Sequence, residues 1–395
     1  MTAPSNGLGV AIVGAGMIGQ AHAAGYRAVN AVEGPKLPPV RLVAIADINA
    51  TLAQHVADRF GYQRAETTWQ AVAEADDVDV VVVAVANFLH REVVEGMLAA
   101  GKHVLCEKPL APSIEDGQAM VAAAERAPGQ QTAVGFSFRR NPAIAAIRDY
   151  VNDGTLGRPL HFAGRYWCDY GADPRGPMSW RYKGAPGSGA LADIGSHLVD
   201  LAEFVCGPIA SVRGAVLSTS ITERALPAGT AIGHAAAELS DTYEPVENED
   251  VVSVTAAFAS GASATLTATR ISFGHPNALG FELFASEGAA KYDLERPGEF
   301  QIWDAAPAAR TNGYRTALAG PAQPYLSGGL PMNFPGVGFG QNDLFVWQAR
   351  AFLEQVTGIE GNLPPVATFA DGVRNLRLLA AITESAQSGS EVKIA

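Results

Sequence analysis

Charged residues and cysteines are scarce in this sequence, and each shortage excludes a class of protein. Only 17% of the 395 residues are charged, and 40 acidic residues outnumber 28 basic ones, which gives a net charge of −12. This balance argues against binding to nucleic acid or to anionic membrane surfaces. The three cysteines are odd in number and lack metal-ligand spacing, so they predict neither a disulfide framework nor a zinc site.

Long apolar runs are missing as well. Each run is broken by polar residues well before the ~18 residues that a membrane span needs, and the N-terminus lacks the basic start and apolar core of a signal peptide. We therefore expect a cytoplasmic protein whose partners are small molecules. At 395 residues with 48% hydrophobic content, the chain is long enough for two or three domains with sizeable cores.

A glycine-rich turn between a strand and a helix is the most informative stretch, in GVAIVGAGMIGQAH at residues 9–22. Gly14, Gly16 and Gly19 form G-x-G-x-x-G, in which the glycines allow a tight turn, close approach to a pyrophosphate and close helix packing. The helix start presents backbone N–H groups to phosphate. A purely structural glycine turn is the alternative. The predicted phosphate-binding residues are Gly14, Gly16, Met17 and Ile18.

The acidic residue after the second strand decides between the two nicotinamide cofactors. Strand 40–46 ends at Asp47, which lies further past Gly19 than the about 20 residues that are usual. A carboxylate there accepts hydrogen bonds from the ribose diol of NAD and repels the 2′-phosphate of NADP. Because Ile48 and Asn49 supply no cation, the sequence favours NAD.

The order of elements predicts an α/β protein with two domains. Strands and helices alternate over roughly the first 135 residues, which is typical of a doubly wound parallel sheet. We predict a Rossmann domain over 1–137. Longer strands with alternating polarity follow, so we predict an α+β domain with a large, mainly antiparallel open sheet over 138–395. Segments 220–249 and 305–340 show no period and are expected to be lids or subunit contacts.

Two motifs follow neighbouring strands at the edge where such sheets bind ligands. Asn87, in Ala86-Asn87-Phe88-Leu89-His90, is placed to hydrogen-bond the cofactor, although Asn87 and His90 can equally form a turn and a helix cap. Glu107-Lys108-Pro109 would place an ammonium beside the nicotinamide, where it favours the alkoxide form of a substrate hydroxyl. The proline would fix this turn, with a cis peptide bond as one option. A solvated lysine is the alternative.

A third motif, Asp193-Ile-Gly-Ser-His197, leads into an apolar helix. Residues four apart share a helix face, so Asp193 and His197 can reach one substrate. Alcohol oxidation releases a proton as well as a hydride, and a histidine pKa near ~6.5 suits a general base. The alternative is an N-cap and a surface histidine. We expect no metal, because a third ligand of suitable spacing is missing.

These motifs together resemble the Gfo/Idh/MocA family of oxidoreductases over nearly the whole chain. The glycine turn, Asn87 with His90, Glu107-Lys108-Pro109 and Asp193 with His197 stand in the family's order. One departure is Val85-Ala86-Asn87, where relatives often have Thr-Pro-Asn. The resemblance implies a Rossmann domain, a second domain whose open sheet makes subunit contacts, and a homo-oligomer, a dimer or tetramer.

The resemblance also implies roles for individual residues. Lys108 would polarise the reacting hydroxyl, Asp193 would orient the substrate, and His197 would be the acid/base. The implied cofactor contacts beyond the glycine turn and Asp47 are Ala86, Asn87, His90, Glu107, Lys108, Trp180 and Arg181. The implied substrate contacts are Lys108, Arg139, Asn141, Tyr166, Asp193 and His197.

The implied reaction is NAD-dependent oxidation of a ring hydroxyl. Aromatic residues around the expected site suit the C–H face of a cyclic sugar or polyol, although each taken singly also fits an ordinary core residue: Phe136, Phe138, Tyr166, Trp167, Tyr170, Trp180 and Tyr182. The chain looks most like the levoglucosan and inositol dehydrogenase branch, with the C3 hydroxyl of levoglucosan or a related sugar as the expected target. Redox-neutral NAD-using glycoside hydrolases and a non-catalytic dinucleotide-binding sensor remain alternatives.

Overall fold

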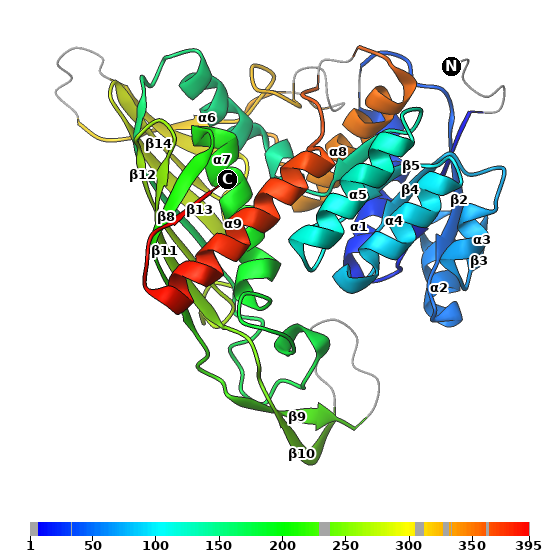
Figure 1. Ribbon diagram of the computed structural model, residues 1–395. Helices are drawn as coiled ribbons and strands as arrows, with labels where there is room; N and C mark the ends of the chain where they lie inside the picture. The colour runs from blue at the N-terminus through cyan, green and yellow to red at the C-terminus, as the bar shows by residue number, and fades with distance from the viewer. Residues whose placement is uncertain are drawn as a thin grey trace. The chain divides into compact units, whose positions relative to one another are not determined.

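The chain forms two compact units (Figure 1). The computed structural model describes residues 7–32, 34–228, 238–304, 312–326, 332, 334–360 and 363–394. The first unit comprises Met1–Asn141 and Gly320–Leu376, and the second comprises Pro142–Ala319 and Arg377–Ala395. Residues 320–376, which the sequence analysis assigned to the second domain, thus belong to the first unit. The reason is apolar packing: helix α8 (Gln341–Thr357) packs on α1 (Met17–Ala28), and its Phe352 and Leu353 join the core around strand β1 (Leu8–Val13).

The first unit contains a six-stranded parallel sheet in the order β3-β2-β1-β4-β5-β6. Its strands are β1 (Leu8–Val13), β2 (Val40–Ala46), β3 (Arg64–Glu66), β4 (Val80–Val83), β5 (His103–Cys106) and β6 (Thr132–Val134). Its other helices are α2 (Ala50–Phe60), α3 (Trp69–Ala73), α4 (His90–Ala99) and α5 (Ile114–Arg126). Separate apolar clusters fill the two faces of this sheet. This confirms the predicted doubly wound fold. Strand order reverses between β1 and β4, where such sheets bind ligands.

The second unit is organised around a nine-stranded mixed sheet in the order β16-β15-β14-β13-β7-β12-β11-β8-β17. The strands are β7 (Pro159–Trp167), β8 (Ile209–Ser218), β11 (Val251–Phe258), β12 (Ser263–Thr269), β13 (Ala278–Ala285), β14 (Gly288–Asp293), β15 (Glu299–Asp304), β16 (Arg315–Leu318) and β17 (Val392–Lys393). Among the described strands of this second sheet, only β7 and β12 pair in parallel. The predicted large, mainly antiparallel sheet is therefore confirmed.

Helices cover one face of this sheet, and the alternating burial of its strands follows from that. Helix α7 (Ser196–Cys206) packs on β7 and β12, and α6 (Pro142–Asn152) packs on α7 and β14. Along β7, alternate side chains such as Phe162 and Tyr166 are buried, whereas the residues between them are partly exposed. Helix α9 (Phe369–Ser388) runs from the first unit into the second.

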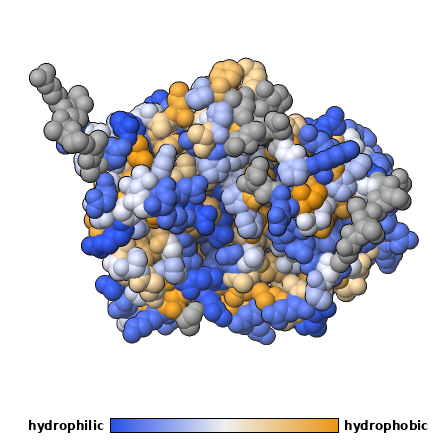
Figure 2. Space-filling model, turned by 90° about the horizontal axis from the view of Figure 1, so that it is seen from above, coloured by the Kyte–Doolittle hydropathy of each residue, from blue (hydrophilic) through white to orange (hydrophobic). Residues whose placement is uncertain are grey.

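Two strands lie where the sequence showed no period. Strands β9 (Glu223–Pro227) and β10 (Leu239–Pro245) form an antiparallel pair within segment 220–249 (Figure 1). The other aperiodic segment, 305–340, contains β16, and its residues 305–311, 327–331 and 333 lie outside the described chain. None of the described helices is both long and apolar enough to cross a membrane. On the face seen in Figure 2, hydrophobic and hydrophilic residues are intermixed.

Candidate active site

The glycine turn has the geometry that a dinucleotide requires. Gly14 has a φ of +103°, and a Cβ there would lie 2.4 Å from the carbonyl oxygen of Ala84. A Cβ on Gly19 would lie 1.8 Å from the carbonyl oxygen of Gly14, so only glycine allows α1 to start so close to β1. At Gly16 a Cβ would meet nothing within 4 Å. The turn is tight at its base and open at the helix start, where a pyrophosphate would approach.

Asp47 fixes this turn to the end of the second strand. Its Oδ2 accepts a hydrogen bond from the backbone N–H of Ala15 at 2.8 Å, and its Oδ1 accepts one from Asn49 at 2.9 Å. Helix α1 carries no acidic residue of its own in its first turn. Open backbone donors and a carboxylate beside them fit the pyrophosphate and the ribose of NAD.

His90 is buried and contacts both loops at the ligand-binding edge of the sheet, the one after β4 and the one after β5. It is 1% exposed, its Nε2 lies 3.1 Å from the carbonyl oxygen of Val85, and its Nδ1 lies 3.1 Å and 3.2 Å from those of Pro109 and Leu110. Burial lowers the pKa of His90, although these carbonyl groups oppose that shift. The imidazole therefore joins the loop after β4 to the loop that follows Lys108. Its predicted contact with the cofactor stays a prediction.

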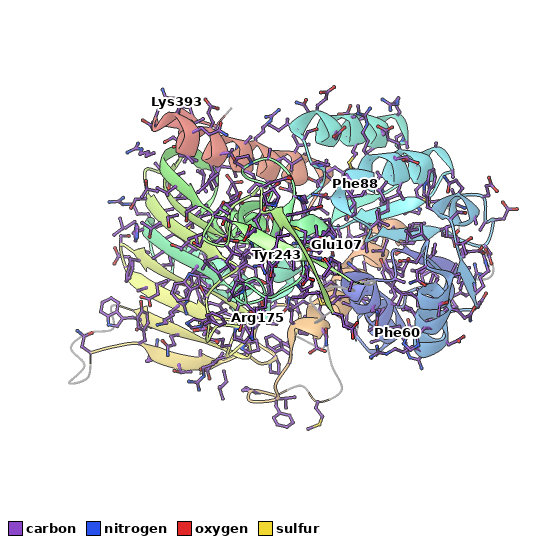
Figure 3. The ribbon with its side chains drawn as sticks, turned by 90° about the horizontal axis from the view of Figure 1, so that it is seen from below. Phe60, Phe88, Glu107, Arg175, Tyr243 and Lys393 are labelled. Carbon is purple, nitrogen blue, oxygen red and sulfur yellow. The ribbon has the colours of Figure 1, made fainter. Side chains whose placement is uncertain are left out.

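Asn87, by contrast, is partly exposed. It begins a short 3-10 turn, Asn87–Leu89, separated from the end of β4 by three residues, and Phe88 in this turn is 64% exposed (Figure 3). Ala86 precedes the turn in an extended conformation. This placement leaves the amide of Asn87 near the surface at the carboxyl end of β4, where the sequence predicted a cofactor contact.

Glu107 forms a buried pair with His22 that the sequence analysis missed. Its Oε1 lies 2.8 Å from Nε2 of His22 on α1, which is fully buried, and its Oε2 accepts a hydrogen bond from the backbone N–H of Lys108 at 3.1 Å. A Cβ on Gly135, the residue after β6, would lie 2.4 Å from the Glu107 carboxylate, so glycine there leaves room for it. The Lys108–Pro109 peptide bond is cis. Glu107 thus connects the dinucleotide helix to the backbone of Lys108. The sequence feature that could have indicated this pair is His22, a polar residue among the apolar ones of the helix after the glycine turn.

Arg139 and Asn141 lie at the end of the first unit's N-terminal segment. Arg139 belongs to a 3-10 turn, Ser137–Arg140, and its Nη2 lies 3.7 Å from Oδ1 of Asp371, while Asn141 is fully buried. The neighbouring Arg140, also missed, donates hydrogen bonds of 2.6 Å and 2.7 Å to the carbonyl oxygens of Pro364 and Pro365. Arg140 therefore anchors the turn to segment 320–376, which returns to the first unit.

In the second unit, Asp193 and His197 lie close to two tyrosines. Asp193 lies in a π-helical turn, Leu191–Gly195, and His197 lies in the first turn of α7 and is 8% exposed. Tyr170 donates a hydrogen bond of 2.6 Å to Oδ2 of Asp193, and the ring of Tyr166 lies 6.3 Å from that of His197. The hydroxyl of Tyr166 donates to Oδ1 of Asn277 at 2.9 Å. A π-helical turn inside an α-helix is frequent at functional sites.

The backbone that leads into this turn is held by three consecutive polar residues before β11. Glu247 accepts a hydrogen bond from Gly184 N–H at 2.8 Å, and Asn248 donates to the carbonyl oxygen of Arg181 at 3.1 Å. Glu249, which is 2% exposed, accepts hydrogen bonds from the backbone N–H groups of Gly187 at 2.7 Å and Leu191 at 2.9 Å. In the sequence this run lies at the end of the aperiodic segment 220–249.

Trp180 and Arg181 form the exposed side of the same segment. They begin a 3-10 turn, Trp180–Tyr182, in which Trp180 is 53% exposed and the Arg181 guanidinium lies 4.6 Å from its ring centroid. Tyr182, in contrast, is buried, and its ring is contacted by the guanidinium groups of Arg224 at 4.2 Å and Arg270 at 4.6 Å. The exposed indole is available to a ligand.

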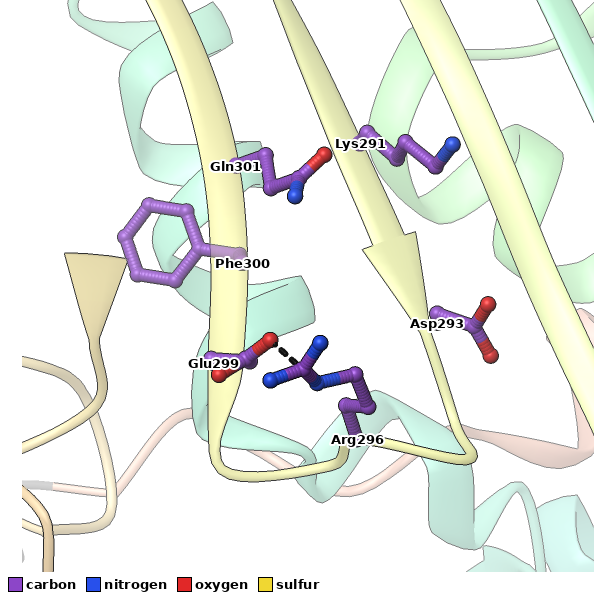
Figure 4. A pocket seen from close by; sticks show the side chains of 6 residues that line it. All are labelled: Lys291, Asp293, Arg296, Glu299, Phe300 and Gln301. Carbon is purple, nitrogen blue, oxygen red and sulfur yellow. Dashed lines mark ion pairs between the residues drawn. The ribbon is translucent and has the colours of Figure 1, made fainter. Parts of the chain in front are cut away.

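A shallow pocket at the β14–β15 turn does not coincide with these residues. Its lining side chains, shown in Figure 4, are Lys291, Asp293, Arg296, Glu299, Phe300 and Gln301. The charges pair within the sheet: Arg296 lies 2.6 Å from Glu299, Lys291 lies 3.0 Å from Glu282, and Asp293 lies 2.9 Å from Arg165. Their charges are compensated without a ligand. No group of three or more His, Cys, Asp or Glu suited to a metal occurs within the described ranges.

Comparisons with known proteins match both parts of the chain. Residues 8–136 match the family described as "Oxidoreductase family, NAD-binding Rossmann fold", and residues 144–291 match "GFO/IDH/MocA C-terminal domain". The levoglucosan dehydrogenase of Pseudarthrobacter phenanthrenivorans is 37% identical over 98% of both chains. The inositol 2-dehydrogenase of Salmonella typhimurium is 32% identical over 40% of this chain and 45% of its own.

Solved structures give the same result. A levoglucosan dehydrogenase in complex with NADH and levoglucosan superposes with a TM-score of 0.88 at 34% identity, covering 98% of this chain and 99% of that chain. An NAD binding oxidoreductase from Klebsiella pneumoniae superposes with a TM-score of 0.86 at 33% identity, over 98% and 99% of the two chains. These matches confirm the predicted cofactor, NAD.

Proposed function

Because the chain belongs to the Gfo/Idh/MocA family of oxidoreductases, we propose that it oxidises a ring secondary hydroxyl of a cyclic sugar or polyol to a ketone. NAD is the cofactor. The first proposed substrate is levoglucosan at its C3 hydroxyl, or a related glucose-type sugar, and the second is an inositol. The main support for the proposal is that Asp193 and His197 lie on one helical turn. The rings of Tyr170 and Tyr166 lie beside them.

Binding of the cofactor is assigned to the first unit. Gly14, Gly16 and the start of α1 at Met17 and Ile18 would hold the pyrophosphate, and Asp47 would accept hydrogen bonds from the adenosine ribose. When bound, NAD supplies the hydride acceptor. Asn87 is partly exposed at the carboxyl end of β4 and would bind toward the nicotinamide half. In the second unit, the exposed ring of Trp180 and the Arg181 guanidinium on it are proposed to cover the cofactor.

Removal of the hydroxyl proton is assigned to His197. A secondary alcohol loses a proton as its carbon loses a hydride, so a base within hydrogen-bond reach of that hydroxyl is required. His197 is nearly buried beside the Tyr166 ring, which suits it to this role. Asp193 would orient the substrate, and the Lys108 ammonium would favour the alkoxide. Arg139 and Asn141 are proposed to contact the substrate or the nicotinamide.

Assembly into a dimer or tetramer through the open face of the nine-stranded sheet is part of the proposal. Side chains between the buried ones of its strands are partly exposed, and some form cross-strand ion pairs such as Lys291 with Glu282 at 3.0 Å. Light scattering coupled to gel filtration measures the assembly directly. A monomer at working concentrations would contradict this part.

The proposed function is tested by an absorbance screen for reduced nicotinamide with NAD and then NADP. The panel contains levoglucosan, inositols, glucose, galactose and xylose. With NAD we expect steady NADH formation from one cyclic polyol. With NADP we expect little NADPH formation from the same compound. Tight NAD binding without NADH from any member would contradict the dehydrogenase and favour a redox-neutral hydrolase, which recycles its cofactor, or a sensor.

A further inference from the structure

Tyr170, one of the aromatic residues expected around the site, contacts the proposed substrate-orienting residue directly. Its hydroxyl donates a hydrogen bond of 2.6 Å to Oδ2 of Asp193, 23 positions further along the chain. The distance is that of a hydrogen bond between a hydroxyl and a carboxylate, which is among the stronger kinds.

The backbone around Tyr170 is held on both sides by the neighbouring strand end. The N–H of Cys168 donates to the carbonyl oxygen of Thr269 at 2.8 Å, and the N–H of Gly171 donates to that of Arg270 at 2.8 Å. Arg270 in turn is 1% exposed and lies 2.9 Å from the buried carboxylate of Asp250. The turn that carries Tyr170 is therefore joined by backbone hydrogen bonds on both sides to the end of β12.

The chemical state of the hydroxyl is fixed as well. Burial and the adjacent Asp193 carboxylate both raise the pKa of Tyr170 well above its usual value. The phenol stays protonated in the working range of an enzyme, so toward a carboxylate it acts as a donor.

Asp193 lies in the π-helical turn Leu191–Gly195, and its backbone N–H donates to the carbonyl oxygen of Gly189 at 3.0 Å. The backbone position of Asp193 is thus set, whereas the rotation of its carboxylate is a separate matter. An aspartate side chain on such a turn can rotate about two bonds, and each orientation would present its oxygens differently to a sugar hydroxyl. Small errors of placement are costly, since a displacement of about 1 Å can lower a rate about 10²-fold.

We propose that Tyr170 is a positioning residue for the reaction: by donating to Oδ2 it fixes the rotation of the Asp193 carboxylate, so that Asp193 orients the sugar without first having to be ordered. The inference rests on the proposed function and deepens it. A purely structural role for the same bond predicts a loss of stability alone.

The test is a double-mutant cycle of Tyr170→Phe and Asp193→Asn, measured with the sugar that the wild-type enzyme oxidises. Tyr170→Phe keeps the ring and removes only the donor. We expect kcat to fall about tenfold or more, with NADH affinity, measured by fluorescence, unchanged. In the Asp193→Asn background the same substitution should change kcat little, because Tyr170 acts through Asp193.

The matched control is Tyr62→Phe, because the Tyr62 hydroxyl is buried and has no hydrogen-bond partner among the described residues. It should leave kcat unchanged. Melting temperatures of both variants check folding.

Wild-type kcat in Tyr170→Phe, or losses that multiply in the double variant, would overturn the inference while the proposed function stands. No turnover by the wild-type enzyme with any sugar would overturn the proposed function instead, and the inference with it.

Discussion

Replacing Glu249 with glutamine should weaken the segment that leads into the Asp193 turn. The Glu249 carboxylate is 2% exposed and accepts two backbone hydrogen bonds, from Gly187 and Leu191. The isosteric amide has one acceptor oxygen, so its NH₂ group would face one of the two backbone donors. At least one charge-assisted bond is lost, and the N–H of either Gly187 or Leu191 is left without an acceptor.

The size of the effect follows from those two contacts. A hydrogen bond to a charged group contributes about 1.5–3 kcal/mol, and an unsatisfied buried donor costs about 1–3 kcal/mol, with partial overlap between the two. We therefore expect the free energy of unfolding to fall by about 2–4 kcal/mol. For a unit of the second unit's size this lowers the melting temperature by about 4–16 °C.

Glu247→Gln is the matched control, two residues away. Glu247 also accepts a backbone hydrogen bond, from Gly184 at 2.8 Å, but its side chain is 45% exposed. Its ion pair with Lys183 lies near solvent, so Glu247→Gln should lower the free energy of unfolding by no more than about 1 kcal/mol. Calorimetric melting of both variants, with kcat measured at 25 °C, gives the comparison, and kcat should fall in Glu249→Gln because Leu191 begins the turn that carries Asp193.

Equal melting temperatures for Glu249→Gln and Glu247→Gln would refute this reasoning. They would mean that burial does not set the strength of these contacts. A lower melting temperature with unchanged kcat would keep the stability argument and remove the link to Asp193.

Three further outcomes are expected. Lys108→Ala and His197→Ala should keep NADH binding, measured by fluorescence, but lose roughly 10²-fold in kcat; near-full turnover in either variant would remove that residue from the mechanism. Asp47→Ala should reduce the preference for NAD over NADP about tenfold or more, because a charge-assisted acceptor is lost, and an unchanged ratio of kcat/KM values would show that the ribose is bound elsewhere. Since burial lowers the pKa of His90, the unfolded state binds the extra proton first, so stability should fall as the pH drops below about 6.5; melting at pH 7.5 and 5.5 should show a smaller fall in His90→Gln, and equal falls would contradict this assignment.

Local sequence patterns were sufficient to predict the sheet of the first unit and the family of the chain. The glycine turn, the apolar run at 80–83 and the motifs after successive strands each occupy a few neighbouring residues, and the steric limits of glycine or the burial of β-branched side chains act over that range. The resemblance to the Gfo/Idh/MocA family and the preference for NAD, both read from those motifs, are confirmed. The residue roles drawn from that resemblance stay predictions.

Tertiary structure alone decided which side chains support the site. His22 and Glu107 are 85 residues apart, Glu249 and Leu191 are 58 apart, and residues 320–376 return to the first unit. Such pairings depend on strand order, on register and on which helix packs on which face, and no local pattern encodes these. The sequence by itself determined the cofactor turn, the fold class and the candidate chemistry. The buried partners that hold Lys108 and Asp193 in place were determined by packing, because a buried polar group must find its partner wherever the fold places one.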